Sequence, residues 1–171
     1  RILLVRHGKA AAGWDGHADP GLDPLGATQA KLVADLLAGE GPMTVVSSPL
    51  ARARETAEPL AEAWGAEIAI EDRVAEIPSP SEDLAERAAW LREAMAGDWS
   101  ALRARWTAWR DDLVDYLAGI TEDTVVFSHF VAINAAVGQA EGSDALVSFR
   151  PGNGSVTRLA NDGGVLAVLD G

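Results

Sequence analysis

The stretch Ile2-Leu3-Leu4-Val5-Arg6-His7-Gly8 begins with four apolar residues typical of a buried strand and ends with a cation beside an imidazole. In open α/β sheets, ligands bind outside the carboxyl ends of the strands. We predict a strand over residues 2–6, and Arg6 at its end with His7 beside it indicates an anion site at that edge. A phosphate group is the anion that a guanidinium fork matches. The neutral imidazole beside it is a candidate nucleophile.

Short apolar runs alternate with helix-length segments along the rest of the chain. The further strand candidates are residues 44–48, 67–71, 124–128, 155–160 and 165–169. The spacing of the first four strands indicates βαβ units, and Asn161-Asp162-Gly163-Gly164 indicates an antiparallel hairpin between the last two. We predict an α/β fold, a three-layer α/β/α sandwich with a mixed, mainly parallel six-stranded sheet and an antiparallel edge hairpin.

Two helices have readable starts, because Asp23-Pro24 and Ser48-Pro49 each offer an N-cap followed by a favoured first residue. For the first helix we expect one apolar face, made of Leu25, Leu32, Val33, Leu36 and Leu37. We predict two more helices, over residues 82–96 and 100–117. Both belong to a helical insertion at about 79–117, which we expect to cover part of the site. Its tryptophans, Trp90, Trp99, Trp106 and Trp109, are interpreted as packing anchors, with lining of the substrate cavity as the alternative.

Composition limits the class of protein. The 171 residues are 48% hydrophobic and 23% charged, which predicts one globular domain over residues 1–171. A net charge of −12 argues against nucleic acid as a partner. No apolar run approaches the roughly 20 residues that cross a bilayer, and no secretory leader pattern is present, so we expect no membrane association. The absence of cysteine fits a reducing compartment, and we expect a cytoplasmic protein.

Two further motifs carry candidate site residues. Ser47-Ser48-Pro49-Leu50-Ala51-Arg52 follows a strand and places Arg52 in the first turn of a helix, where free N–H groups favour anions. Residues 125–129 form another apolar strand that ends in Ser128-His129. Three strand ends thus bring Arg6, His7, Arg52 and His129 to one edge. Lys9 and Arg54 are interpreted as ordinary surface or helix charges. His17 is interpreted as a solvated loop residue, with a loop that borders the pocket as the alternative.

At this point the sequence resembles the histidine phosphatase superfamily, with its phosphoglycerate-mutase-like fold. The matching pieces are Leu4-Val5-Arg6-His7-Gly8, residues 19–26, residues 47–53 and Ser128-His129, and together they cover most of the chain. The resemblance implies that His7 is phosphorylated during turnover and that Arg6, Arg52 and His129 bind the phosphoryl oxygens. Nothing in this scheme requires a metal or another cofactor, and we expect a backbone carbonyl of the Gly8 turn to orient His7.

The leaving group needs a proton donor, and a carboxylic acid beside the phosphate is the usual one. We select Glu76, because Val74-Ala75-Glu76-Ile77-Pro78 looks like the acid-bearing segment of the family. A loop carboxylate in a surface ion pair is the alternative. Glu82 and Asp83 are the reserve candidates, although both also suit the first turn of a helix.

The chain departs from the family pattern at several places. Phe130 stands where a glycine commonly follows the second histidine, and Ile77-Pro78-Ser79-Pro80-Ser81 replaces a stretch rich in glycine and aromatic residues. Ala10-Ala11-Ala12-Gly13 replaces the polar residues that mutases use, and the Arg- and Tyr-containing segment of true mutases is missing. Residues 152–155 are interpreted as a plain turn, with a backbone approach to the pocket as the alternative.

We therefore expect a metal-independent phosphomonoesterase that acts on a small phosphorylated metabolite through a phosphohistidine intermediate. The enzyme alternatives are a mutase-type phosphoryl transfer and a phosphohistidine-protein phosphatase. Small phosphatases of the latter type tend to lack the helical insertion expected here. A phosphate-recognition module without catalysis is the alternative from another class.

Overall fold

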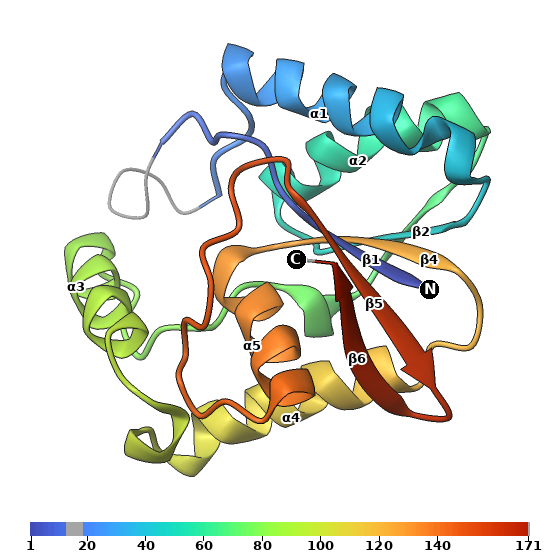
Figure 1. The fold of residues 1–171 in the computed structure, drawn as a ribbon. Coiled ribbons are helices and arrows are strands. Elements are labelled where there is room, and N and C mark those ends of the chain that lie inside the picture. Colours follow the sequence, from blue (N-terminus) through green and yellow to red (C-terminus); the bar gives the residue numbers. More distant parts are fainter. Residues whose placement is uncertain (13–18, 171) are drawn as a thin grey trace.

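The computed structural model describes residues 1–12 and 19–170, so His17 lies outside the described residues. One six-stranded sheet runs through the molecule in the order β3-β2-β4-β1-β5-β6 (Figure 1). The strands are β1 (Ile2–Arg6), β2 (Thr44–Ser47), β3 (Ile68–Ile70), β4 (Thr124–Ser128), β5 (Val156–Asp162) and β6 (Val165–Asp170). The first four are parallel, and β5 and β6 form an antiparallel hairpin at the edge, which confirms the predicted sheet.

Helices cover both faces of this sheet. They are α1 (Pro24–Leu37), α2 (Ala51–Trp64), α3 (Leu84–Met95), α4 (Ala104–Ala118) and α5 (Phe130–Glu141), with short 3-10 turns at Ala38–Glu40, Asp72–Val74 and Trp99–Ala101. In Figure 1, α1 and α2 lie on one side of the sheet and α4 and α5 on the other. Leu3 and Val5 pack in the core on the α1 and α2 side, whereas Ile2 and Leu4 pack in the opposite core. Burial on both faces explains the uninterrupted apolar run of β1 and confirms the three layers.

The predicted start of α1 is confirmed, but its predicted apolar face is partly wrong. Asp23 Oδ1 accepts a hydrogen bond of 2.7 Å from the Gly26 N–H, and Pro24 is the first helical residue. The residues that α1 buries are Gly26, Ala30, Val33, Ala34 and Leu37. Leu25, Leu32 and Leu36 are instead exposed, because the face of α1 that shares a core cluster with α2 carries Val33, Ala34 and Leu37. The buried stripe is therefore rotated away from these three leucines.

The predicted N-cap of α2 at Ser48 is wrong, since the helix begins at Ala51. The Ala51 N–H donates to Asp19 Oδ1 at 2.9 Å, so a carboxylate from a distant loop takes part in capping this helix. The Leu50 N–H donates to Ser48 Oγ at 3.1 Å. Ser48 consequently lies outside α2, in the connection between β2 and the helix.

Two of the four tryptophans are confirmed as packing anchors. Trp99 and Trp106 are only 1% and 5% exposed, in the core on the α4 and α5 side. Trp90 and Trp109 are half-buried against the same core, and the rings of Trp90 and Trp106 have centroids 4.7 Å apart. None of the described helices combines the length and the apolar composition that a membrane-spanning segment requires.

The backbone of α1 at Gly26 packs closely against the backbone of Lys9, in the segment that follows β1. One substitution in α1 should therefore lower the stability of the protein strongly. A Cβ at Gly26 would lie 2.2 Å from the Lys9 carbonyl oxygen, so the backbone must shift in Gly26→Ala. We expect this variant to lose about 1–3 kcal/mol of unfolding free energy, measured by urea denaturation. Gly39→Ala is the matched control, because a Cβ there meets no atom within 4 Å. Equal stability of the two variants would contradict the packing described here.

Candidate active site

The structure brings the four residues predicted from the three motifs to the carboxyl edge of the sheet. Arg6 ends β1 and His7 follows it, Arg52 lies in the first turn of α2, and His129 lies between β4 and α5. Arg52 Nε is 3.3 Å from His7 Nε2, and the rings of His7 and His129 have centroids 5.2 Å apart. His7, Arg52 and His129 are all buried. The site is therefore a local concentration of nitrogen donors in an acidic protein.

His7 is held in one orientation and one tautomer. Its Nδ1 lies 2.7 Å from the Gly8 carbonyl oxygen, which confirms the expected orienting group. Because a carbonyl can only accept, Nδ1 carries the proton, and Nε2 keeps the lone pair that faces the Arg52 Nε–H. Burial, with smaller contributions from the charges of Arg52 and Arg6, lowers the pKa of His7 to about 3. At neutral pH the Nε2 atom is thus unprotonated and carries a lone pair.

His129 and Arg6 each have a buried nitrogen without a partner. His129 Nε2 is 2.8 Å from Ser48 Oγ, whereas His129 Nδ1 and Arg6 Nε have no hydrogen bond within the described part of the chain. Burial holds the pKa of His129 well below its usual value. If the Ser48 hydroxyl donates to Nε2, the neutral ring presents an N–H at Nδ1. Buried donors without acceptors are costly, by about 1–3 kcal/mol each, and favour binding of an anion that supplies the acceptors.

Glu76 lies in the loop after β3 and faces the start of α5. Its carboxylate accepts hydrogen bonds of 3.0 Å from the N–H groups of Ile77, Val131 and Ala132. Burial raises the pKa of Glu76, although these three bonds and the charge of Arg52 favour the ionised form. The carboxyl group is therefore fixed beside Arg52 and not in a surface ion pair with a neighbour. Of the reserve candidates, Asp83 accepts from the Glu86 N–H as the cap of α3, and Glu82 is exposed.

A cavity of about 220 Å³ opens beside this cluster. Arg52 and Glu76 contribute to its wall, together with Arg87, Trp90 and Leu91 from α3. Trp90 thus lines a cavity as well as packing, which joins the two interpretations of this residue. Sequence reasoning did not single out Arg87, because nothing in the helical pattern separates it from the other charged residues of α3. In the described residues, no three His, Cys, Asp or Glu side chains gather as a metal site would require.

Comparison with known proteins identifies the family. The family model of the histidine phosphatase superfamily (branch 1) matches residues 2–170. The chain belongs to the histidine phosphatase superfamily. This confirms the family to which the motifs pointed.

Individual relatives carry different names. The chain is similar to a glucosyl-3-phosphoglycerate phosphatase of Mycolicibacterium vanbaalenii, with 32% identity over 126 residues, 66% of this chain and 48% of the relative. A probable phosphoglycerate mutase of Photorhabdus laumondii is 38% identical over 81 residues, 45% of this chain and 38% of the relative. The matched part of the chain thus spans about half or less of the length of these curated relatives.

The fold has counterparts among solved structures. The structure of phosphoserine phosphatase from Entamoeba histolytica in complex with 3-phosphoglyceric acid has a TM-score of 0.77 and 22% identity. This match covers 99% of the present chain and 94% of that chain. At this level of identity the likeness shows that the two proteins share the histidine phosphatase fold.

In this member of the superfamily, residues outside the predicted set hold the His7-Gly8 turn. The Gly8 N–H donates to Thr56 Oγ1 at 2.9 Å, and the Thr56 hydroxyl donates to the Arg52 carbonyl at 2.7 Å. Asn153 Nδ2 donates to the His7 carbonyl at 3.1 Å. Residues 152–155 therefore approach the site, so their interpretation as a plain turn was incomplete. Thr56 was missed because a threonine inside a helix has no distinctive sequence signal.

The Thr56 contacts predict a positioning role. In Thr56→Val the Gly8 N–H loses its buried acceptor, which costs about 1–3 kcal/mol of stability. We expect kcat to fall about tenfold because the His7 ring loses its fixed orientation. Steady-state kinetics and thermal melting measure the two effects, and Thr56→Ser, which retains the hydroxyl, is the control. Wild-type kcat in a folded Thr56→Val protein would contradict the role.

The departure at Phe130 also has a structural account. The Arg6 guanidinium carbon lies 5.1 Å from the centroid of the Phe130 ring, and Arg6 Nη1 donates to the Pro151 carbonyl at 2.9 Å. The aromatic ring that replaces the usual glycine therefore helps to fix the guanidinium.

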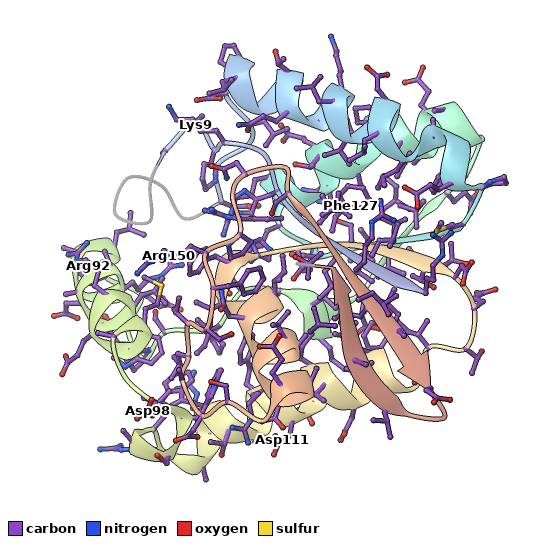
Figure 2. The ribbon with its side chains drawn as sticks, in the orientation of Figure 1. Lys9, Arg92, Asp98, Asp111, Phe127 and Arg150 are labelled. Carbon is purple, nitrogen blue, oxygen red and sulfur yellow. The ribbon has the colours of Figure 1, made fainter. Side chains whose placement is uncertain are left out.

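Lys9, on the outer surface near the start of α1 (Figure 2), lies 3.7 Å from Asp23 Oδ2. Arg54 Nε donates to the Pro49 carbonyl, so both residues have structural partners.

Proposed function

We propose that the chain is a metal-independent phosphoric monoester hydrolase that acts on a small phosphorylated metabolite through a phosphohistidine at His7. The observation that carries this proposal is the unprotonated Nε2 of His7, oriented by the Gly8 carbonyl and facing Arg52. The arginines supply the positive charge that a metal ion supplies in other phosphoryl-transfer sites. The family supports this class of reaction.

In the first half-reaction, the phosphoryl oxygens bind to the donors of Arg6, Arg52 and His129. The lone pair of His7 Nε2 attacks phosphorus in line with the ester bond, the P–N bond forms, and the P–O bond to the alcohol breaks. Glu76, in its protonated form, donates its proton to the departing oxygen. The fixed guanidinium groups stabilise the charge on the equatorial oxygens in the transition state.

In the second half-reaction, water enters on the side that the alcohol has left. The ionised Glu76 takes a proton from this water as its oxygen attacks phosphorus, and the P–N bond breaks. Inorganic phosphate leaves, and His7 and Glu76 return to their starting protonation states. The acid step and the base step therefore require only one carboxyl group. It loses its proton in the first half-reaction and regains a proton in the second.

A mutase is the second candidate function, and the match to a probable phosphoglycerate mutase favours it. A mutase would keep the alcohol bound and return the phosphoryl group to another hydroxyl. The hydrolase is preferred because the match to the phosphatase is longer and the mutase-type polar residues after Gly8 are absent.

The lack of cysteine supports the cytoplasmic location that we also propose.

The test is incubation with 3-phosphoglycerate and a panel of other phosphomonoesters in the presence of EDTA. Released inorganic phosphate is measured by colorimetry, and positional isomers are followed by phosphorus NMR. We expect stoichiometric release of phosphate that EDTA does not change. Isomerisation without net release would establish the mutase instead. Binding of inorganic phosphate without turnover of any ester would indicate the recognition module.

A further inference from the structure

We infer that a second cavity, between α3 and the start of α4 (Figure 1), binds a small ligand that combines an aromatic ring with an anionic group. This cavity has a volume of about 380 Å³, against about 220 Å³ for the cavity of the active site. Among the residues that the structure describes, its wall consists of Pro80, Trp90, residues 101–103, Arg105 and Trp106. None of these residues belongs to the proposed phosphoryl ligands or proton donor, so the inference does not depend on the proposed hydrolase.

Aromatic rings form one side of this cavity. Trp90 is half-buried on α3 and Trp106 is buried on α4, and their ring centroids are 4.7 Å apart with the ring planes 43° apart. The guanidinium carbon of Arg105 lies over the Trp106 ring, 4.4 Å from its centroid. An aromatic ligand packs favourably against indole rings and against a guanidinium plane. This side of the cavity therefore favours a ligand with an aromatic ring.

The same cavity wall carries two arginines without carboxylate partners. Arg103 and Arg105 are exposed, and neither forms an ion pair within residues 1–12 and 19–170. Arg110, further along α4, by contrast lies 3.0 Å from Asp111. The protein has 26 acidic and 14 basic residues, so carboxylates are plentiful. Two unpaired guanidinium groups in one cavity wall of such a protein favour an anion from solution.

The start of α4 adds to this positive charge. Arg103 is the N-cap residue of the helix, and its side chain makes no capping hydrogen bond. The first turn, which contains Arg105, holds no acidic residue. A helix N-terminus carries partial positive charge, so two cations at this end are unfavourable for the stability of α4. Stability therefore does not explain these arginines, whereas an anion bound between them would offset the repulsion.

Trp90 lies between this cavity and the active-site cavity. Among the described residues of the two walls, Trp90 is the one that both cavities share. A ligand in the second cavity therefore contacts a residue of the active-site wall. Trp106 lines the second cavity and not the first, so its indole N–H signal in an NMR spectrum reports binding at the second cavity.

Three probes test the inference on the wild-type protein by calorimetry. Naphthalene-2-sulfonate has a ring system and a charge, naphthalene-2-sulfonamide has the ring system without the charge, and methanesulfonate has the charge without the ring system. None of them contains a phosphoester bond. We expect the Kd of naphthalene-2-sulfonate to be at least about tenfold lower than that of either other probe. The Trp106 indole signal should shift as this probe is added.

Inorganic phosphate in excess separates the two cavities. Phosphate is expected to occupy the donors around His7, so the Kd of naphthalene-2-sulfonate should change by less than about twofold when phosphate is added. Displacement of the probe by phosphate would instead place the probe in the active site.

Variants of single arginines separate the site from general electrostatic attraction. Arg103→Gln and Arg105→Gln should each raise the Kd of naphthalene-2-sulfonate by about five- to twentyfold. The exposed Arg92 lies on α3 (Figure 2), outside the described walls of both cavities. Arg92→Gln removes the same charge and should change this Kd by less than about twofold. Removal of a cation from the start of α4 should not lower the melting temperature of either wall variant.

Four outcomes would overturn the inference. Equal Kd values for the sulfonate and the sulfonamide would remove the role of the arginines. Displacement by phosphate, or an unchanged Trp106 signal in the saturated protein, would place the binding elsewhere. An equal loss of affinity in Arg92→Gln would reduce the effect to the net charge of the protein. Absence of binding for all three probes would show that the cavity takes no aromatic anion, while turnover of phosphomonoesters stays a separate measurement.

Discussion

Replacement of His7 by alanine is expected to reduce kcat for every phosphomonoester by at least about 10³-fold, because the variant has no atom that can accept the phosphoryl group. Arg6 and His129 are held by the Pro151 carbonyl and the Ser48 hydroxyl and keep these contacts in the variant, whereas Arg52 loses only the contact between its Nε and His7 Nε2. We therefore expect His7→Ala to retain binding of inorganic phosphate, measured by calorimetry, while steady-state assays show no turnover.

The matched control for this prediction is His129→Ala. This variant removes one of the proposed phosphoryl ligands but keeps the proposed nucleophile, so we expect weaker phosphate binding and residual turnover. Both histidines are buried, and the melting temperature of each variant establishes that a lost activity is not a lost fold. A folded His7→Ala protein with more than about one-tenth of the wild-type kcat would reject His7 as the nucleophile.

The pH dependence of turnover is expected to follow Glu76. Burial raises the pKa of this carboxyl group, so its protonated, proton-donating form persists to a higher pH than for an ordinary glutamate and is lost as the pH rises through that raised pKa. Burial lowers the pKa of His7 to about 3, so its Nε2 is unprotonated at pH values above that and is available as the proposed nucleophile in mild acid. The wild-type kcat for an alkyl phosphate should therefore be high in mild acid and fall on the alkaline side.

Glu76→Gln should remove that alkaline fall and lower kcat for alkyl phosphates by about 10²- to 10⁴-fold. The loss should be much smaller for 4-nitrophenyl phosphate, because nitrophenolate leaves without a proton. The exposed Glu82, also in the segment before α3, provides the control variant Glu82→Gln. An unchanged alkaline limb in Glu76→Gln, or an equal loss for both types of ester, would show that another group is the acid.

Strand ends explain why so much of the site could be predicted from sequence. β1 and β4 have the predicted bounds, and their ends deliver Arg6, His7 and His129 because parallel neighbours terminate at the same edge. The same reasoning, applied to the end of β2 and the start of α2, predicts the position of Arg52. Local sequence is sufficient here, since each residue is placed by its own strand or helix.

The features that sequence reasoning missed depend on contacts between distant segments. Asp19 caps α2 from a different loop, which moves the start of that helix past Ser48. The carboxylate of Glu76 is fixed by N–H groups of α5, and Val131 is 55 residues away. Arg87 lines the cavity only because α3 lies beside the Glu76 loop. No periodicity or motif within one segment reports such contacts.

Direct detection of the phosphoenzyme tests the central claim most directly. The protein is mixed with excess substrate, quenched in alkali within the first turnover, digested and analysed by mass spectrometry. We predict one phosphoryl group on His7, stable to alkali and lost in acid, and absent from His7→Ala. Release of phosphate at the wild-type rate with no phosphorylated His7 at any quench time would contradict the account.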